Sequence, residues 1–180
     1  MGEKAVRQKI LVIHGPNLNM LGKREPDIYG RLTLDEINDQ LKARANKLEL
    51  ELEIFQSNHE GHIVEKIQQA HDTFHGILIN PAAYTHTSVA IRDALVMMDI
   101  PVVEIHLSNI QKREPFRHTS LISDIVYAQI AGFGSHGYIL ALDGLAQILS
   151  GLNQVFIAKT EYFPKKRLEV AQQTGRPRSN

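Results

Sequence analysis

The chain has 180 residues, with twenty basic and twenty acidic side chains and no cysteine. This length favours one domain with a substantial core, and the lack of cysteine excludes disulfide frameworks and thiolate-ligated zinc. A formal charge of zero argues against a nucleic-acid or anionic-membrane surface over the whole chain. Because no apolar run approaches the ~20 residues of a membrane span and residues 1–10 lack a signal-peptide core, we expect a cytoplasmic protein.

The first predicted element is a strand over residues 10–13, where four consecutive apolar residues favour burial on both faces. The pattern breaks at Gly15 and Pro16. A polar loop of about 15 residues or more follows, beyond the ordinary range for compact domains. Such a loop is typical of a lid or binding loop, with a charged surface loop as the alternative. Its glycines fit neither a phosphate-binding loop nor a dinucleotide fingerprint.

Helices and strands alternate along the rest of the chain. Thr33 and Glu36 fit a capping box for a helix that runs to about residue 48. Further helices are expected over 59–71, 87–98 and 137–149, and further strands over 50–55, 77–79 and 102–105; 124–131 contains a helix or a strand. This alternation predicts an α/β fold, an open parallel sheet of about five strands in flavodoxin-like order with helices on both faces.

Polar residues follow several of these strands. In open α/β sheets, ligands bind beyond the carboxyl ends of the strands, so we expect Asn17, Asn80, His106 and Ser108 to converge. Glu104 precedes His106 by two residues and shares its side of the strand, where it can orient the imidazole as a general acid or base. Asn80 can instead be a turn residue before proline.

Other candidates leave two interpretations open. Arg113 and Arg117 share one face if their segment is helical, where they could clamp a carboxylate or polyol, or they form solvated ion pairs with Glu114. His86 either contacts a ligand or helps to cap the next helix. The spacings His59-x-x-His62 and His71-x-x-x-His75 could suit a metal but lack the glutamate of HExxH, so surface histidines are favoured.

Three segments carry a family resemblance: GPNLNMLGKREPDIYG at 15–30, NPAAYTHTSVAIRDAL at 80–95 and EIHLSNIQKREPFRHTS at 104–120. With these motifs in order, the chain resembles the type II 3-dehydroquinate dehydratases from about residue 10 to residue 149, including GYILAL at 137–142. The resemblance implies a flavodoxin-like fold, a homododecamer built as a tetramer of trimers, and neither metal nor organic cofactor.

The reaction that the resemblance implies is a step of the shikimate pathway towards aromatic amino acids. This lyase removes water from its partner, the small molecule 3-dehydroquinate, by anti elimination through an enolate to give 3-dehydroshikimate. Tyr29 corresponds to the family base. Because a phenol has a pKa near 10, it needs cationic neighbours to act as tyrosinate, and Arg24 with Arg113 suits that role.

The remaining roles also follow from the resemblance. Asn17 corresponds to the residue that holds a water at the enolate oxygen, His106 to the proton donor for the departing hydroxyl, and Glu104 to its orienting partner. Substrate binding is assigned to Asn80, His86, Asp93, Leu107, Ser108, Arg113 and Arg117. Leu107 and Ser108 would act through backbone N–H groups on the carboxylate, and Asp93 would reach the site of an adjacent subunit. His14 departs from the family, since many members have asparagine there.

The chain divides into a catalytic domain, 1–150, and a basic extension, 151–180, that exceeds the usual family length. Residues 159–180 carry six basic and two acidic side chains, a net charge of +4. A solvated, partly flexible extension is favoured over contact with nucleic acid or a neighbouring subunit. Two other functions stay open: a flavodoxin-like module that binds flavin or phosphate, and a metal-dependent hydrolase that uses the paired histidines.

Overall fold

The computed structural model describes residues 7–23 and 32–155. Its centre is a five-stranded parallel sheet in the order β2-β1-β3-β4-β5, which is the predicted flavodoxin-like order. The ambiguous segment 124–131 ends in a strand. The strands are β1 (Lys9–His14), β2 (Glu51–Gln56), β3 (Gly76–Asn80), β4 (Val102–His106) and β5 (Ala128–Ala131).

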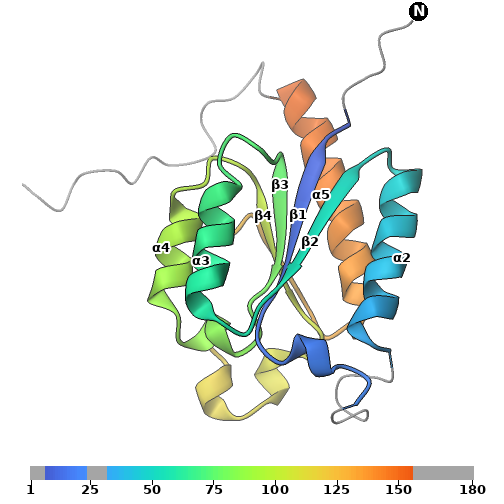
Figure 1. Cartoon of the computed structure of the whole chain (residues 1–180). Helices are drawn as coiled ribbons and strands as arrows, with labels where there is room; N and C mark the ends of the chain where they lie inside the picture. The colour runs from blue at the N-terminus through green and yellow to red at the C-terminus, as the bar shows by residue number, and fades with distance from the viewer. Residues whose placement is uncertain (1–6, 24–31, 156–180) are drawn as a thin grey trace, which may run out of the picture.

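Helices cover both faces of the sheet, as predicted. One face carries α2 (Leu34–Lys47) and α5 (His136–Val155), and the other carries α3 (Glu60–Gln69) and α4 (Val89–Val96) (Figure 1). Short 3₁₀ helices occupy the loops beyond the strands: η1 (Leu18–Met20), η2 (Ala82–His86), η3 (Ile110–Lys112) and η4 (Pro115–Arg117). In the described ranges, no helix is both long and apolar enough to cross a membrane.

The helix boundaries follow local chemistry. The capping box is confirmed, because the Thr33 hydroxyl accepts from the Glu36 N–H at 3.3 Å and the Glu36 carboxylate accepts from the Thr33 N–H at 2.8 Å. Ser88 caps α4 by accepting from the Ile91 N–H, in line with the predicted start, and the helix ends at Val96, two residues before the predicted end. The helix α5 is longer, continuing through Gly151 to Val155, where no proline stops it.

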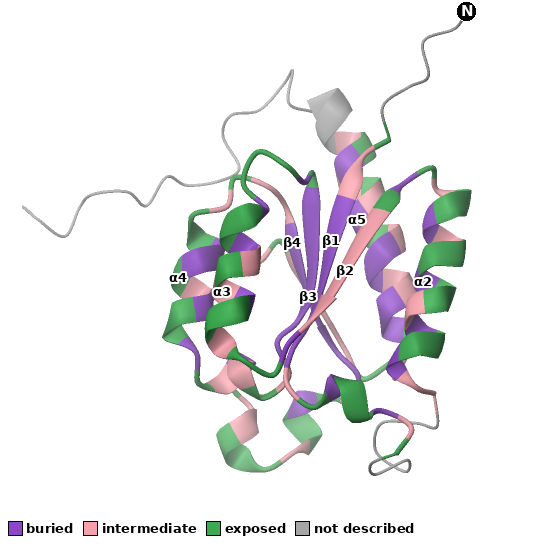
Figure 2. Cartoon of the chain, in the orientation of Figure 1, coloured by how far each residue is buried: buried purple, intermediate pink, exposed green. Residues whose placement is uncertain are grey.

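The core forms two layers, one on each side of the sheet. Alternate residues of β1 serve opposite layers: Ile10 and Val12 pack with α2 and α5, whereas Leu11 and Ile13 pack with α3 and α4. Figure 2 shows the central strands β1 and β3 as buried, with the edge strand β2 only partly so. Successive side chains of a strand point to opposite faces of the sheet. A continuous apolar run in β1 is therefore needed to fill both core layers.

The first strand ends in a close approach between two loops. The Gly15 N–H donates to the Asn80 carbonyl at 2.8 Å, and a Cβ at Gly15 would lie 2.4 Å from the Pro81 carbonyl oxygen. Gly15→Ala should therefore lower the free energy of unfolding by about 1–3 kcal/mol, measured by urea denaturation. Gly61→Ala on α3 is the matched control, since a Cβ there meets nothing within 4 Å. Equal stability of the two variants would contradict the steric explanation.

Candidate active site

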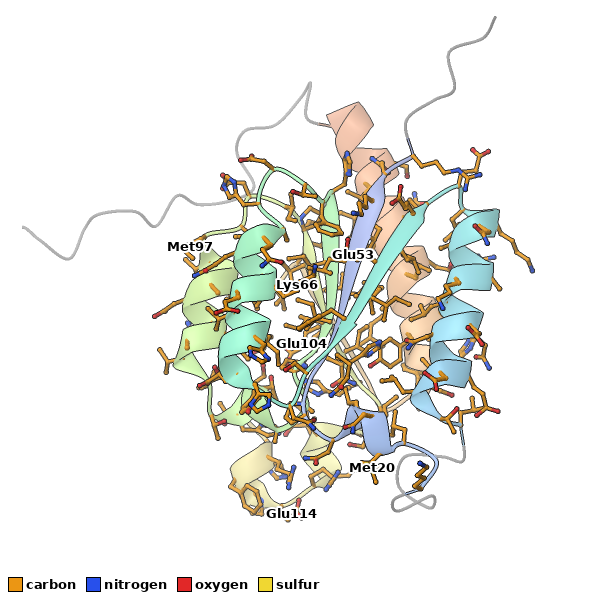
Figure 3. The ribbon with its side chains drawn as sticks, in the orientation of Figure 1. Met20, Glu53, Lys66, Met97, Glu104 and Glu114 are labelled. Carbon is orange, nitrogen blue, oxygen red and sulfur yellow. The ribbon has the colours of Figure 1, made fainter. Side chains whose placement is uncertain are left out.

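A cavity of about 310 Å³ opens beyond the carboxyl ends of β1, β3 and β4. Its walls come from η1, from the loops after β3 and β4, and from η3 and η4. Figure 3 labels Met20 and Glu114, two lining residues, at this end of the molecule. The predicted residues that line the cavity are Asn17, Asn80, His86, His106, Leu107, Ser108, Arg113 and Arg117. The convergence that the strand-end rule predicted is therefore present, at a candidate site.

The other predicted residues lie elsewhere. Glu104 is fully buried in β4, behind the cavity wall, where it bonds to His106. Asp93 is exposed on α4 and does not line the cavity of its own chain. Arg24 and Tyr29 lie outside the described residues.

The best-defined chemical pair is His106 with Glu104, at the end of β4. Two residues apart, they lie on the same side of the strand, and His106 Nε2 is 2.7 Å from Glu104 Oε1. Only 5% of His106 is exposed, and Glu104 is fully buried. Since Nε2 is directed at the carboxylate, Nδ1 is the ring nitrogen left to meet a ligand. This arrangement fixes the ring as a general acid or base requires.

The Glu104 carboxylate is surrounded by donors. Oε1 accepts from the Thr85 hydroxyl and from Ser120 Oγ at 2.8 Å, while Oε2 accepts from Ser120 Oγ at 3.0 Å and from Gln129 Nε2 at 2.7 Å. Burial opposes ionisation, but His106, Thr85 and Ser120 outweigh it and hold the pKa of Glu104 below its usual value. Glu104 is thus an ionised anchor for the His106 ring.

Sequence reasoning missed these three donors. Gln129 lies opposite Glu104 in the pairing of β4 with β5, a neighbour that is visible only once 128–131 is assigned as a strand. Thr85 and Ser120 come from η2 and from the loop before β5. No spacing rule connects those two positions to Glu104.

Arg113 and Arg117 do not share a helical face. Pro115 begins η4, so the segment forms two separate 3₁₀ turns instead of one helix. Arg113 Nε lies 3.5 Å and Arg117 Nε 3.2 Å from Glu114 Oε2, although the Arg117 contact lacks hydrogen-bond geometry. The ion pairs with Glu114 are present, and both guanidinium groups still line the cavity. The contacts with Glu114 are therefore confirmed, and the clamp on a carboxylate or polyol stays a prediction.

Asn17 is held at the cavity by its backbone. Its φ of 66° lies in the left-handed region, which asparagine tolerates better than most residues. The Asn17 N–H donates to Asn58 Oδ1 at 2.9 Å, and Gln56 Nε2 donates to the same oxygen at 3.1 Å. Tyr84 then donates its hydroxyl hydrogen to the Asn58 carbonyl at 2.8 Å.

Asn80 and His86 approach the cavity from the loop after β3. Asn80 Oδ1 accepts from the Ala82 N–H at 3.1 Å, so the residue is a turn former and a cavity residue at once. His86 does not cap α4. Its Nδ1 donates to the Thr119 carbonyl at 2.7 Å, which leaves Nε2 for a ligand.

Comparison with known proteins places the chain in a family. The family model described as dehydroquinase class II matches residues 8–146. The chain belongs to this family. It is 60% identical over 139 residues to the 3-dehydroquinate dehydratase of Acaryochloris marina, covering 77% of this chain and 93% of that protein. The 3-dehydroquinate dehydratase of Acinetobacter baylyi is 61% identical over 135 residues, covering 74% and 91%.

A solved structure supports the same assignment. The type II dehydroquinase of Butyrivibrio crossotus superposes with a TM-score of 0.76 at 48% identity and covers 77% of this chain and 97% of that one. Sequence and fold therefore agree on the dehydroquinase family.

His14, where the resemblance led us to expect asparagine, is fully buried at the end of β1. It does not bond to Asn17. Its Nδ1 lies 2.8 Å from the Tyr138 hydroxyl and its Nε2 lies 2.9 Å from Asn38 Oδ1. Burial lowers the pKa of His14 to about 4 and outweighs the hydrogen bond with Asn38, which acts in the opposite direction. His14 is therefore neutral at physiological pH.

This burial predicts a pH dependence of stability. As the pH falls below 6.5, the unfolded chain takes up a proton on His14 that the folded chain excludes until about pH 4. Between pH 7.5 and pH 4.5 this difference should remove about 2–3 kcal/mol from the free energy of unfolding. Urea denaturation at both pH values should therefore show a smaller loss for His14→Asn than for the wild type. Equal losses would mean that His14 is not excluded from protonation.

The paired histidines do not form a metal centre within the part of the chain that is described. His59, His62, His71 and His75 are all exposed, and no group of three or more potential ligands occurs there. The His59 and His62 rings pack against each other with centroids 4.9 Å apart, and His75 Nδ1 accepts from the Lys9 N–H at 3.0 Å. The preferred interpretation as surface histidines fits these positions.

Proposed function

We propose that the chain is a type II 3-dehydroquinate dehydratase, a lyase of the shikimate pathway that converts 3-dehydroquinate to 3-dehydroshikimate and serves aromatic amino acid biosynthesis. Anti elimination through an enolate needs a base, an acid and fixed donors, and neither metal nor organic cofactor. The observation that carries this proposal is the buried His106–Glu104 pair, which opens onto a cavity lined by Arg113 and Arg117.

His106 is proposed as the acid. Hydroxide is a poor leaving group, so the departing oxygen needs a proton as its bond to carbon breaks. Glu104 orients the ring through Nε2, and Nδ1 would deliver the proton. To complete the cycle, Tyr29 would release to solvent the proton that it took from the substrate, and the His106 ring would take one up from solvent, so that loss of water is the net reaction.

Tyr29 is proposed as the base, with Arg24 beside it; both lie outside the described residues. Each unit by which the pKa of a phenol is lowered requires about 1.4 kcal/mol, a demand that two nearby guanidinium groups can meet in a poorly solvated site. Arg113 supplies one of these charges at the cavity wall. The enolate oxygen would be stabilised through a water held by Asn17.

Substrate binding is proposed to use the rest of the cavity wall. Asn80, His86 and Arg117 would contact ring hydroxyls, and the backbone N–H groups of Leu107 and Ser108 would bind the carboxylate. Each of these residues lines the cavity, which supports this assignment.

We also propose a cytoplasmic homododecamer, a tetramer of trimers, in which Asp93 reaches the site of a neighbouring subunit. Val89 and Val96 on α4 are each 59% exposed, and the C-cap residue Met97 is 52% exposed. Asp93 lies four residues after Val89 and three before Val96, on the same side of the helix. An exposed apolar helix face of this kind supports an interface. Light scattering of the purified protein measures the mass of the assembly and thereby tests the proposed dodecamer.

The deciding experiment mixes purified protein with 3-dehydroquinate and follows the enone absorbance of the product. We expect the signal to appear, to survive chelation of metals, and to survive borohydride added with substrate, because this mechanism forms no lysine imine. No enone would overturn the proposed function. Inactivation by borohydride would replace the proposed mechanism with an imine-forming one.

A further inference from the structure

A chain of hydrogen-bonded side chains, three of them buried, connects the cavity to α2. Asn80 Nδ2 lies 3.1 Å from the Tyr138 oxygen, which lies 2.8 Å from His14 Nδ1; His14 Nε2 in turn lies 2.9 Å from Asn38 Oδ1. His14 and Tyr138 are fully buried, and Asn80 is 3% exposed. The proposed mechanism uses Asn80 alone among these four residues.

The directions of the hydrogen bonds in this chain are determined by a backbone donor at one end and by the Asn38 oxygen at the other. The Ala82 N–H can only donate, so the Asn80 atom 3.1 Å from it is Oδ1, and the amide nitrogen faces Tyr138. The Tyr138 oxygen therefore accepts from Asn80. At the other end, the Asn38 oxygen can only accept, so neutral His14 carries its hydrogen on Nε2, and its Nδ1 accepts from the Tyr138 hydroxyl.

This order makes the Asn80 amide hard to turn over. A flipped amide would place its NH₂ group against the Ala82 N–H, two donors facing each other in a buried place. It would also require the Tyr138 hydroxyl to turn from His14 towards Asn80, which leaves His14 Nδ1 without a donor. In the observed orientation, one hydrogen of Asn80 Nδ2 is used by Tyr138, and the second is available to a ligand.

We infer that Tyr138 and His14 are positioning residues that hold the Asn80 amide with an N–H directed at the bound substrate. This corner of the cavity then selects a ligand oxygen that accepts a hydrogen bond. The inference rests on the proposed function, in which that oxygen is a ring hydroxyl of 3-dehydroquinate.

The test is a double-mutant cycle on the full chain with 3-dehydroquinate as the probe. Tyr138→Phe keeps the ring and removes the hydroxyl. It should raise KM about tenfold, which is the effect expected from the loss of one hydrogen bond to the substrate, and it should change kcat by less than about threefold. In an Asn80→Ala background, the same change should alter KM by less than about twofold, because Tyr138 has nothing left to position.

Three results would decide against the inference. An unchanged KM in Tyr138→Phe would overturn it, and so would a tenfold rise in both backgrounds, since Tyr138 would then act through the fold and not through Asn80. If the wild type forms no enone, the proposed function fails and the inference falls with it. If the wild type forms the enone and only the cycle fails, the proposed function stands.

A second pair of variants covers the case in which Tyr138→Phe does not fold. In His14→Asn, the amide oxygen can take the place of Nδ1 and accept from Tyr138, whereas His14→Leu offers no acceptor. We expect KM within about threefold of the wild type for asparagine and a rise of about tenfold for leucine. Equal KM values for the two variants would contradict a positioning role of His14.

Discussion

Replacing His106 with asparagine should lower kcat for 3-dehydroquinate by about a thousandfold, within the range that general acids contribute. The departing hydroxyl would lose its proton donor, while the asparagine amide could still reach the Glu104 carboxylate that now faces Nε2 at 2.7 Å. Ligand binding should change little, because the arginines and backbone donors of the cavity are retained. Initial rates from enone absorbance give kcat, and calorimetric titration with product gives the affinity.

The matched control for His106 is His62→Asn, which makes the same change at an exposed position on α3 and should leave kcat unchanged. Glu104→Gln provides the complementary test. It keeps the shape of the side chain but loses the charge that the ring and the two hydroxyls surround, so kcat should fall by about ten- to a hundredfold. A His106→Asn enzyme with more than a tenth of the wild-type kcat would refute the assignment of the acid.

The sequence predicted the fold and the position of the site because both depend on short-range patterns. The continuous apolar run of β1 and the alternation in β2 are local signals, and the helices between strands imply crossover connections and hence parallel strands. The carboxyl ends of parallel strands share one edge, so Asn17, Asn80 and His106 had to meet once the strands were assigned. The contact of Glu104 with His106 is equally local, since the two residues are two positions apart.

The parts that escaped prediction depend on tertiary packing. His14 and Tyr138 are 124 positions apart, and nothing in the spacing of either indicates that they share a hydrogen bond. Ser120 and Gln129 reach Glu104 only through the register of β5 and the course of the loop before it. Pro115 rules out the single helix that the spacing of Arg113 and Arg117 suggested. The two arginines still line one cavity, because two 3₁₀ turns take the place of that helix.

Replacing Tyr29 with phenylalanine should abolish turnover, with kcat for 3-dehydroquinate lowered about a thousandfold or more, because no other proposed group takes the α proton. The change removes a single oxygen, so the affinity for product should stay within about threefold of the wild type. Enone absorbance at high enzyme concentration measures the residual rate, and calorimetry measures the affinity.

The control for Tyr29 is Tyr127→Phe, the same removal of a hydroxyl at a residue that is 47% exposed and does not line the cavity. It should retain the wild-type kcat. Comparison with His106→Asn then separates proton removal from loss of the hydroxyl. Exchange of the substrate's α proton with deuterated solvent should persist in the His106 variant, because that variant keeps the base. The same exchange should cease in the Tyr29 variant. Exchange in the Tyr29 variant would assign the base to another group, whatever the overall rate.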